Sequence, residues 1–325
     1  MKRRDFIIAL GGAAAARPLA MRAQQPAAVI GLLTSTNLAD WTMDAIRAGL
    51  QEQGYAEGRN LTVLLRSADG HFDRLPELAA DLVNSQVALI FATGSPVPAR
   101  VAKAATAKIP IVFAYGGDPV ADGLVESLNR PGGNVTGATF IGSALLAKRM
   151  ELFRQVVPDV ADVALLVNPK GTLAERQIKD AMAAGERLRQ RVHVLNMSTV
   201  GEIDTAFEAM KQLKIGAYIV STDPFFGFIG QKRLLELAAR YKLPGIFNSR
   251  VEAGAGGLMS YGPVLADTWQ QAGAYAGRIL KGEKPSELPV MQPIRFETVI
   301  NLKTAKEFGL TIPPAILTLA DDVIE

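Results

Sequence analysis

Short apolar segments alternate with longer amphipathic segments along the chain from residue 28 onward. Most of the short segments are continuously apolar rather than alternating, which is typical of strands that are buried on both faces of a parallel sheet. These runs lie at Val29–Leu33, Leu61–Leu65, Val87–Ala92, Ile111–Ala114, Val163–Val167, Val192–Leu195, Ala217–Val220 and Gly245–Phe247.

The segments between these runs have the period of amphipathic helices. Leu75, Leu78, Ala79, Leu82 and Val83 are spaced to form one apolar stripe, and Trp269, Ala272, Ala276 and Ile279 form another. Repeated strand–helix units of this length favour parallel, doubly wound sheets with right-handed crossovers.

The alternation of predicted strands and helices is interrupted by a turn cluster at residues 129–134. It resumes after an extended stretch at 135–140 and a helix from about Ser143. A glycine-rich passage at 254–262 and a segment at 285–301, extended from Ile294 to Ile300, predict two further crossings. The predicted fold is α/β, with two doubly wound parallel-sheet lobes joined by three hinge crossings. Residues 24–140 plus 258–288 would form one lobe, and residues 141–257 plus 289–325 the other. The alternative is two tandem domains joined by one linker.

The N-terminus has the pattern of an export signal. A basic start, Lys2-Arg3-Arg4, precedes Phe6 and a weakly apolar Ala/Gly-rich stretch, which resembles a twin-arginine signal with cleavage after Ala23. The alternative is an uncleaved amphipathic start. The chain has no cysteine, which excludes disulfides, thiolate metal sites and a lipid-modified cysteine anchor. We therefore expect a periplasmic protein that is not lipid-anchored.

Removing residues 1–23 changes the charge balance. The whole chain has 35 basic and 32 acidic residues, and the leader holds five of the basic and one of the acidic ones, so the remainder has 30 and 31. A nearly neutral mature protein does not indicate binding to nucleic acid or to an anionic membrane surface.

Polar loops follow the predicted strands in both halves of the chain. Ligands of open parallel sheets bind at these carboxyl ends, near helix N-termini. Asp118 and Asp223 each begin an Asp-Pro turn, one in each lobe; either could hold a ligand ammonium or only stabilise its turn. The loops lie at 34–37, 93–96, 116–119, 168–169, 221–224, 248–249 and 260–261, and the aromatic residues near them are Trp41, Tyr115, Phe140, Phe225, Phe226 and Tyr261.

Catalytic motifs are missing. The sequence has no G-x-S-x-G elbow, no phosphate-binding P-loop, no H-E-x-x-H and no dinucleotide fingerprint, and its two histidines, His71 and His193, are far apart. We therefore expect no cofactor, no metal and no enzymatic activity.

Several long motifs resemble the ABC-transporter substrate-binding proteins of the tryptophan/tyrosine type, which have the type I periplasmic-binding-protein fold. The motifs are Ile30–Leu33, Gly54–Asn60, Ile109–Phe113, Gly117–Val120 with Gly123–Val125, Arg130–Gly137, Gly256–Gly262 and Asn301–Ala305. The resemblance covers essentially all of the chain after the leader. Thr93–Pro98, with its extra proline, departs from the Ala/Thr-rich loop that is usual there.

The resemblance implies capture of a small solute, amino-acid-like or an aromatic acid, between two lobes that close by hinge motion. It also implies a monomer whose partner is an ABC permease in the inner membrane. Carried onto matching positions, the ligand-binding residues would be Thr34, Ser35, Ser95, Pro96, Asp118, Thr139, Asp223, Asn248, Ser260 and Tyr261.

Three alternatives share this architecture. A periplasmic enzyme would need an acid/base pair, and Asp118 with Asp223 is the only obvious one. A ligand sensor would present its closed form to a receptor. A sugar-repressor-like regulator would need a helix-turn-helix before Val29, where the export signal lies.

Overall fold

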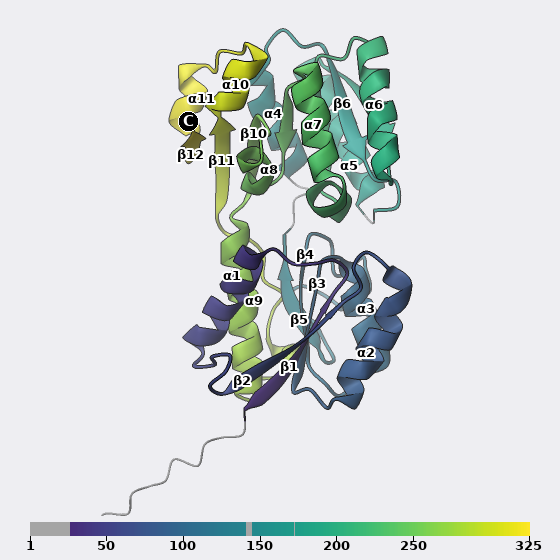
Figure 1. Cartoon of the computed structure of the whole chain (residues 1–325), viewed down its shortest axis with the longest axis vertical. Helices are drawn as coiled ribbons and strands as arrows, with labels where there is room; N and C mark the ends of the chain where they lie inside the picture. Colours follow the sequence, from purple (N-terminus) through teal and green to yellow (C-terminus); the bar gives the residue numbers. More distant parts are fainter. Residues whose placement is uncertain (1–26, 141–144, 172) are drawn as a thin grey trace, which may run out of the picture.

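The computed structural model describes residues 27–140, 145–171 and 173–325, which form two α/β lobes, drawn one above the other in Figure 1. The predicted signal segment, residues 1–23, and the predicted helix start at Ser143 lie outside the described residues. Among the residues that are described, no helix has both the length and the apolar character to span a membrane.

The first lobe contains a five-stranded parallel sheet in the order β2-β1-β3-β4-β5. The helices α2 and α3 cover one face with apolar side chains, and α1 and α9 cover the other. Its elements are β1 Ala28–Thr34, α1 Asp40–Glu52, β2 Leu61–Ser67, η1 Phe72–Arg74, α2 Leu75–Asn84, β3 Leu89–Thr93, α3 Pro96–Ala105, β4 Ile111–Tyr115, β5 Val135–Thr139, α9 Leu265–Leu280 and η4 Pro285–Glu287.

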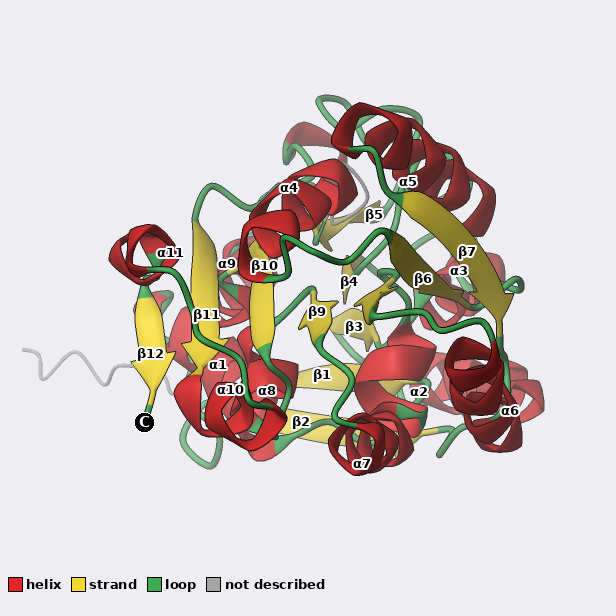
Figure 2. Ribbon diagram, turned by 90° about the horizontal axis from the view of Figure 1, so that it is seen from above, coloured by secondary structure: helices red, strands yellow, loops and turns green. Residues whose placement is uncertain are grey.

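The second lobe contains a seven-stranded sheet in the order β12-β11-β10-β9-β8-β6-β7. In Figure 2, α4 and α5 lie on one side of this sheet and α6 and α7 on the other, and each pair packs on its own apolar core. Its elements are α4 Leu146–Val156, β6 Asp162–Val167, α5 Ala174–Leu188, β7 Arg191–Asn196, α6 Val200–Gln212, β8 Ala217–Val220, the π-helix η3 Phe225–Ile229, α7 Gln231–Tyr241, β9 Gly245–Phe247, α8 Arg250–Gly254, β10 Met259–Pro263, β11 Phe296–Asn301, α10 Leu302–Phe308, α11 Pro314–Leu319 and β12 Asp322–Ile324.

The eight apolar runs coincide with β1–β4 and β6–β9, so the predicted strands are confirmed. The stripe of Trp269, Ala272, Ala276 and Ile279 is buried in α9 and contributes to the core of the first lobe. The central strands β3, β4 and β8 are buried along their whole length, as continuous apolar patterning indicates, whereas the edge strands β2 and β7 are only partly buried.

The chain crosses between the lobes three times, and the second and third crossings lie side by side. The first joins β5 to α4. The second follows Pro263, which pairs with Phe296 where the third crossing enters the second lobe. The third also runs beside β5, because the Met291 amide donates to the Gly137 carbonyl (2.9 Å) and the Thr139 amide donates to the Met291 carbonyl (2.9 Å).

Two predicted lobe boundaries differ from this arrangement. The stretch 258–263 belongs to the second sheet, because β10 pairs with β9 on one side and with β11 on the other. Residues 289–291 belong to the first lobe, since the backbone of Met291 is hydrogen-bonded to β5. The glycine-rich run thus leads into a buried strand, and the crossing comes after it. The strand β11 enters this sheet from the hinge and therefore runs antiparallel to β10.

The helix α9 is fixed to the first lobe by close contact with α1 (Figure 1). A Cβ atom added at Gly49 would lie 1.9 Å from the carbonyl oxygen of Gln270, and one added at Gly273 would lie 2.3 Å from that of Ile46. Only glycine allows the two backbones to approach this closely. A segment from the last part of the sequence thus completes the lobe that begins the chain.

Candidate ligand-binding site

A cavity of about 400 Å³ lies between the two lobes. Its size is within the range of sites that enclose small molecules. Residues of both lobes line it, including the ends of β4 and β10, the first turn of α9 and the N-terminal residues of α7 and α8. The cavity is therefore at the edge of each sheet where strands end and helices begin, the position expected for a ligand site in open α/β sheets.

Aromatic rings form the wall on the side of the first lobe. Trp41 lies on α1, Tyr115 ends β4, Phe140 follows β5 and Trp269 lies on α9. The rings of Phe140 and Trp269 are in contact, with centroids 5.1 Å apart. The Tyr115 hydroxyl donates to Asp122 at 2.7 Å, which fixes its ring. This wall offers flat apolar surfaces for an aromatic or aliphatic ligand body.

The charged residues of the cavity wall all come from the second lobe. They are Arg149 on α4, Asp223 after β8 and Glu252 on α8; Gln231 at the start of α7 and Asn248 after β9 add two amides. One lobe thus supplies most of the aromatic surface, and the other supplies the charges. A ligand with an apolar body and a polar head matches this division.

Arg149 is completely buried and is held by the end of β8 and the loop that follows it. Its guanidinium donates to the Val220 carbonyl (3.0 Å) and to the Thr222 hydroxyl (3.0 Å). Thr222 is itself fixed by Gln177, which accepts from its amide (2.6 Å) and donates to its carbonyl (3.1 Å). Burial lowers the pKa of Arg149 to about 10, and the charge of Glu252 opposes this shift. The guanidinium therefore stays charged at neutral pH.

Glu252 is a buried carboxyl group, with 5% of its surface exposed. Burial raises its pKa to about 7, and this rise is opposed by hydrogen bonding from its own amide and from Ser249, and by the charge of Arg149. Its Oε2 atom has no hydrogen-bond partner among the described residues. Gly227, another residue of the cavity wall, lies next to the other carboxyl oxygen, because a Cβ atom added to it would lie 3.4 Å from Oε1 of Glu252.

Asp223 both lines the cavity and stabilises its own turn. Its Oδ1 accepts hydrogen bonds from Asn168 Nδ2 (3.0 Å) and from the Phe225 amide (2.9 Å), at the start of η3. Burial raises the pKa of Asp223, and the two hydrogen bonds act in the opposite direction. Asp223 can therefore stabilise its turn and also face a ligand ammonium in the cavity, the two interpretations that the sequence left open.

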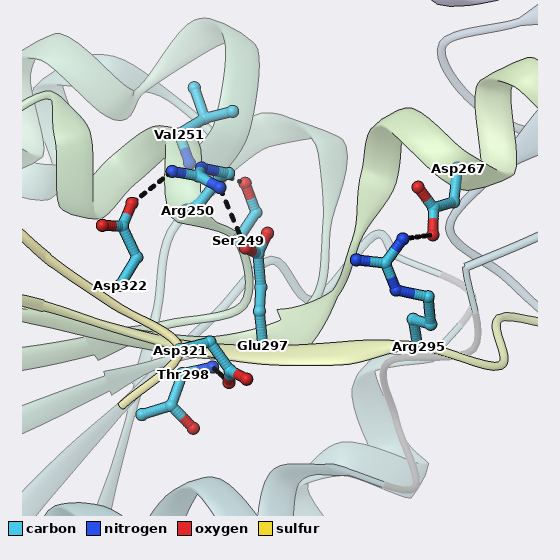
Figure 3. Close-up of polar contacts among 9 residues, drawn as sticks. All are labelled: Ser249, Arg250, Val251, Asp267, Arg295, Glu297, Thr298, Asp321 and Asp322. Carbon is cyan, nitrogen blue, oxygen red and sulfur yellow. Dashed lines mark hydrogen bonds and ion pairs between the residues drawn. The ribbon is translucent and has the colours of Figure 1, made fainter. Parts of the chain in front are cut away.

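The second lobe fixes the helix that carries Glu252 through a charged network beside the cavity (Figure 3). Arg250 begins α8 and contacts Glu297 on β11 (3.0 Å) and Asp322 on β12 (2.5 Å). Burial raises the pKa of Glu297, and the charge of Arg250 lowers it. All three residues belong to one lobe, so hinge motion leaves this network unchanged.

A second ion pair in Figure 3 bridges two crossings. Arg295 lies on the third crossing and donates to Asp267 in the first turn of α9 (2.9 Å). The Arg295 carbonyl also accepts from the Val264 amide (3.1 Å) at the second crossing. These contacts hold the two connections together at the edge of the cavity.

The structure places three of the ten sequence-predicted site residues on the cavity wall: Asp223, Asn248 and Tyr261. The other seven do not line it. They are Thr34, Ser35, Ser95, Pro96, Asp118, Thr139 and Ser260. Their loops reach the cavity through neighbours such as Asn37, Gly94 and Gly116.

Most of these seven residues contribute to local structure instead. Ser95 caps α3 by accepting from the Val97 amide (3.3 Å), and Pro96 begins that helix. Asp118 accepts from the amides of Val120 (3.0 Å) and Ala121 (3.2 Å). The remaining four are buried: Thr34 donates to the Thr36 carbonyl (2.6 Å), Thr139 donates to the Gly117 carbonyl, and Ser35 and Ser260 are covered by neighbouring chain.

Sequence reasoning missed Arg149, Glu252, Gln231 and Trp269 as wall residues. One signal was available for Arg149, because it occupies a position of the buried stripe of α4 that includes Leu146, Met150, Phe153 and Val156. A charged residue inside an apolar stripe indicates a special role. Glu252 is hidden in the pattern Ser-x-x-Glu, which usually marks a helix cap.

Among the described residues, no group of three or more His, Cys, Asp or Glu side chains is arranged so that it could hold a metal ion. His193 lies at β7, where it contacts Asp162 (2.7 Å) on the neighbouring strand.

Two doubly wound lobes, three crossings between them and a cavity between the lobes define a two-lobed binding-protein fold of the type I periplasmic class. The chain belongs to the family of ABC transporter substrate-binding proteins, whose pattern it matches over residues 28–324. The resemblance found in the sequence is thus confirmed.

Three known proteins illustrate the similarity. The tyrosine-binding protein of Clostridioides difficile (strain R20291) is 27% identical over 261 residues, which are 80% of this chain and 74% of that protein. An ABC domain from Streptococcus pneumoniae, solved in complex with L-Trp, is 26% identical with a TM-score of 0.83, covering 92% of this chain and 100% of that one. A conserved domain protein from Vibrio cholerae shares the fold, with a TM-score of 0.81, 23% identity and coverage of 91% and 99%.

Proposed function

We propose that this protein is the periplasmic component of an ABC importer, and that it captures an amino-acid-like solute or an aromatic acid in the interlobe cavity. The observation that carries the proposal is the composition of the cavity wall. Aromatic rings come mainly from one lobe, and the charged side chains come from the other. Neither lobe alone offers a complete site.

Hinge closure completes the site. The second and third crossings pair at Pro263 and Phe296, and the third runs beside the end of β5, so the lobes can rotate about these connections without breaking either sheet. A ligand that contacts both walls stabilises the closed form, and the closed form holds the ligand more tightly. The closed form is what a permease in the inner membrane would recognise. The relatives that bind L-Trp or tyrosine support an amino-acid-like ligand.

Export, cleavage after Ala23 and a monomeric state belong to the same proposal. Fractionation of cells that produce the full chain tests export, because the periplasmic form would lack the leader. Size-exclusion chromatography with light scattering tests the monomer.

The central experiment is a thermal-shift screen of the ligand-free protein against amino acids, aromatic acids, nucleosides and sugars. A ligand that binds only the folded state raises the free energy of unfolding by about 2.7 kcal/mol at a hundredfold excess over its Kd. A hit should also reduce the radius of gyration in small-angle X-ray scattering, and mass spectrometry should recover it unchanged. A hit that returns chemically altered would replace the proposal with an enzyme.

A further inference from the structure

Two polar atoms on the second-lobe wall are buried without a hydrogen-bond partner among the described residues. They are Oε2 of Glu252, an acceptor, and Nε2 of Gln231, a donor. Leaving such groups unpaired costs folding free energy. Unpartnered atoms also occur in Ser35, Thr36, Ser221, Ser260 and Glu297, but these five residues do not line the cavity. In the described part of the chain, a cavity ligand can therefore satisfy the first two atoms without rearranging the core.

The two side chains lie on neighbouring parts of one wall. Gln231 is the first residue of α7, Glu252 lies on α8, and Gly227 of η3 lies against the Glu252 carboxyl group. An unpaired acceptor and an unpaired donor on the same wall match a ligand head that carries both a hydrogen-bond donor and an acceptor.

The charges around Glu252 favour a cation as its partner. The other charged side chains of the wall are Arg149 on α4 and Asp223 after β8. A wall with two carboxyl groups and one guanidinium repels a purely anionic ligand when both carboxyl groups are ionised. A ligand ammonium neutralises the net negative charge of this wall. It also offsets the cost of burying the carboxylate of Glu252, whose pKa burial raises to about 7.

We propose that Glu252 is the specificity-determining residue of the cavity, and that it accepts a hydrogen bond from a protonated amino group of the ligand. The site then selects amino acids over the same molecules without the amino group, while Gln231 donates to an oxygen of the ligand head. This inference rests on the proposed function and decides between its two ligand classes, amino-acid-like solutes and aromatic acids.

The test uses wild-type protein and matched ligand pairs in isothermal titration calorimetry. L-tryptophan is compared with indole-3-propionate, L-tyrosine with 3-(4-hydroxyphenyl)propionate, and L-leucine with 4-methylpentanoate. A charge-assisted hydrogen bond predicts that at least one amino acid binds about tenfold or more tightly than its deaminated partner. A deaminated acid that binds equally well or better overturns the inference and leaves the proposed function standing. Failure of every ligand of this panel, and of the wider screen above, counts against both.

The variant Glu252→Gln gives an independent readout. It keeps the shape of the side chain and removes the negative charge, so the amino acid should bind about tenfold or more weakly and its advantage over the deaminated acid should shrink. The matched control is Glu186→Gln, which removes the same charge from an exposed glutamate of α5 outside the cavity wall; it should keep the wild-type affinity. If Glu252→Gln also keeps the wild-type affinity and selectivity, the assignment of Glu252 is wrong.

The pH dependence of affinity distinguishes an ionised Glu252 that accepts a hydrogen bond from a protonated Glu252 that donates one. An ammonium ligand requires ionised Glu252, so the affinity of wild type should rise between pH 5 and 8, and that of Glu252→Gln should change less. A protonated Glu252 that donates to a ligand carboxylate would produce the reverse slope, and that result would overturn the proposal.

Discussion

Glu252→Gln should change how the stability of the ligand-free protein depends on pH. Burial raises the pKa of this carboxyl group from 4.5 to about 7, so the folded state binds the proton more tightly than the unfolded state does. The resulting stabilisation is complete below pH 4.5 and is lost as the pH rises through about 7. Each pH unit between the two values corresponds to about 1.4 kcal/mol. Ionisation of Glu252 should therefore lower the free energy of unfolding by about 3 kcal/mol.

The assay is urea unfolding of wild type and Glu252→Gln at a series of pH values from 4.5 to 8. The stability of wild type relative to the variant should fall by about 3 kcal/mol across this range; a constant effect of the substitution does not alter the slope. Asp204→Asn serves as a control, because Arg233 lowers the pKa of Asp204 below its ordinary 3.8 and its difference from wild type should be flat. A flat difference for Glu252→Gln as well would refute the reasoning.

Three further predictions concern packing, the aromatic wall and the hinge. Gly49→Ala should lower stability by about 1–3 kcal/mol in urea unfolding, because its methyl group would lie 1.9 Å from a carbonyl oxygen of α9. Gly201→Ala, with nothing within 4 Å of the added methyl group, should be neutral or stabilising. Trp269→Ala should cost about 3–5 kcal/mol of stability and weaken the binding of an aromatic ligand in calorimetry; unchanged affinity would show that this ring does not contact the ligand. The pair of Arg295 and Asp267, whose side chains are 68% and 30% exposed, should give a coupling below about 1 kcal/mol in a double-mutant cycle, and a larger value would contradict a solvent-screened pair.

The fold could be predicted because its main determinants are local. Continuous apolar runs mark buried parallel strands, and stripes such as that of Trp269 and Ile279 mark the helices between them. The lobe boundaries depend instead on contacts between distant segments. Met259 pairs with Ile300, and Met291 lies beside β5. No periodicity near residues 258 or 289 reveals such partners.

The candidate site was predictable at the level of loops and less so at the level of side chains. Hydroxyl and carboxyl groups such as Ser95 and Asp118 lie in the expected loops, but they satisfy nearby backbone amides rather than facing the cavity. In the sequence, Glu252 looks like an ordinary capping glutamate, and the place of Arg149 in the apolar stripe of α4 does not show what the side chain faces. Their burial follows from the packing of α4 and α8 within the second lobe, which only the folded structure reveals.

The position of α9 also affects the order in which the protein can fold during synthesis. The first sheet is complete at Thr139, but its covering helix and the edge partner of β5 lie at residues 265–291. Until the ribosome has made that segment, one face of the sheet is covered only by α1, and the glycine face of α1 remains exposed. Domains commonly fold in the order in which they are synthesised. Here the lobe that emerges first stays incomplete until most of the second lobe has been made.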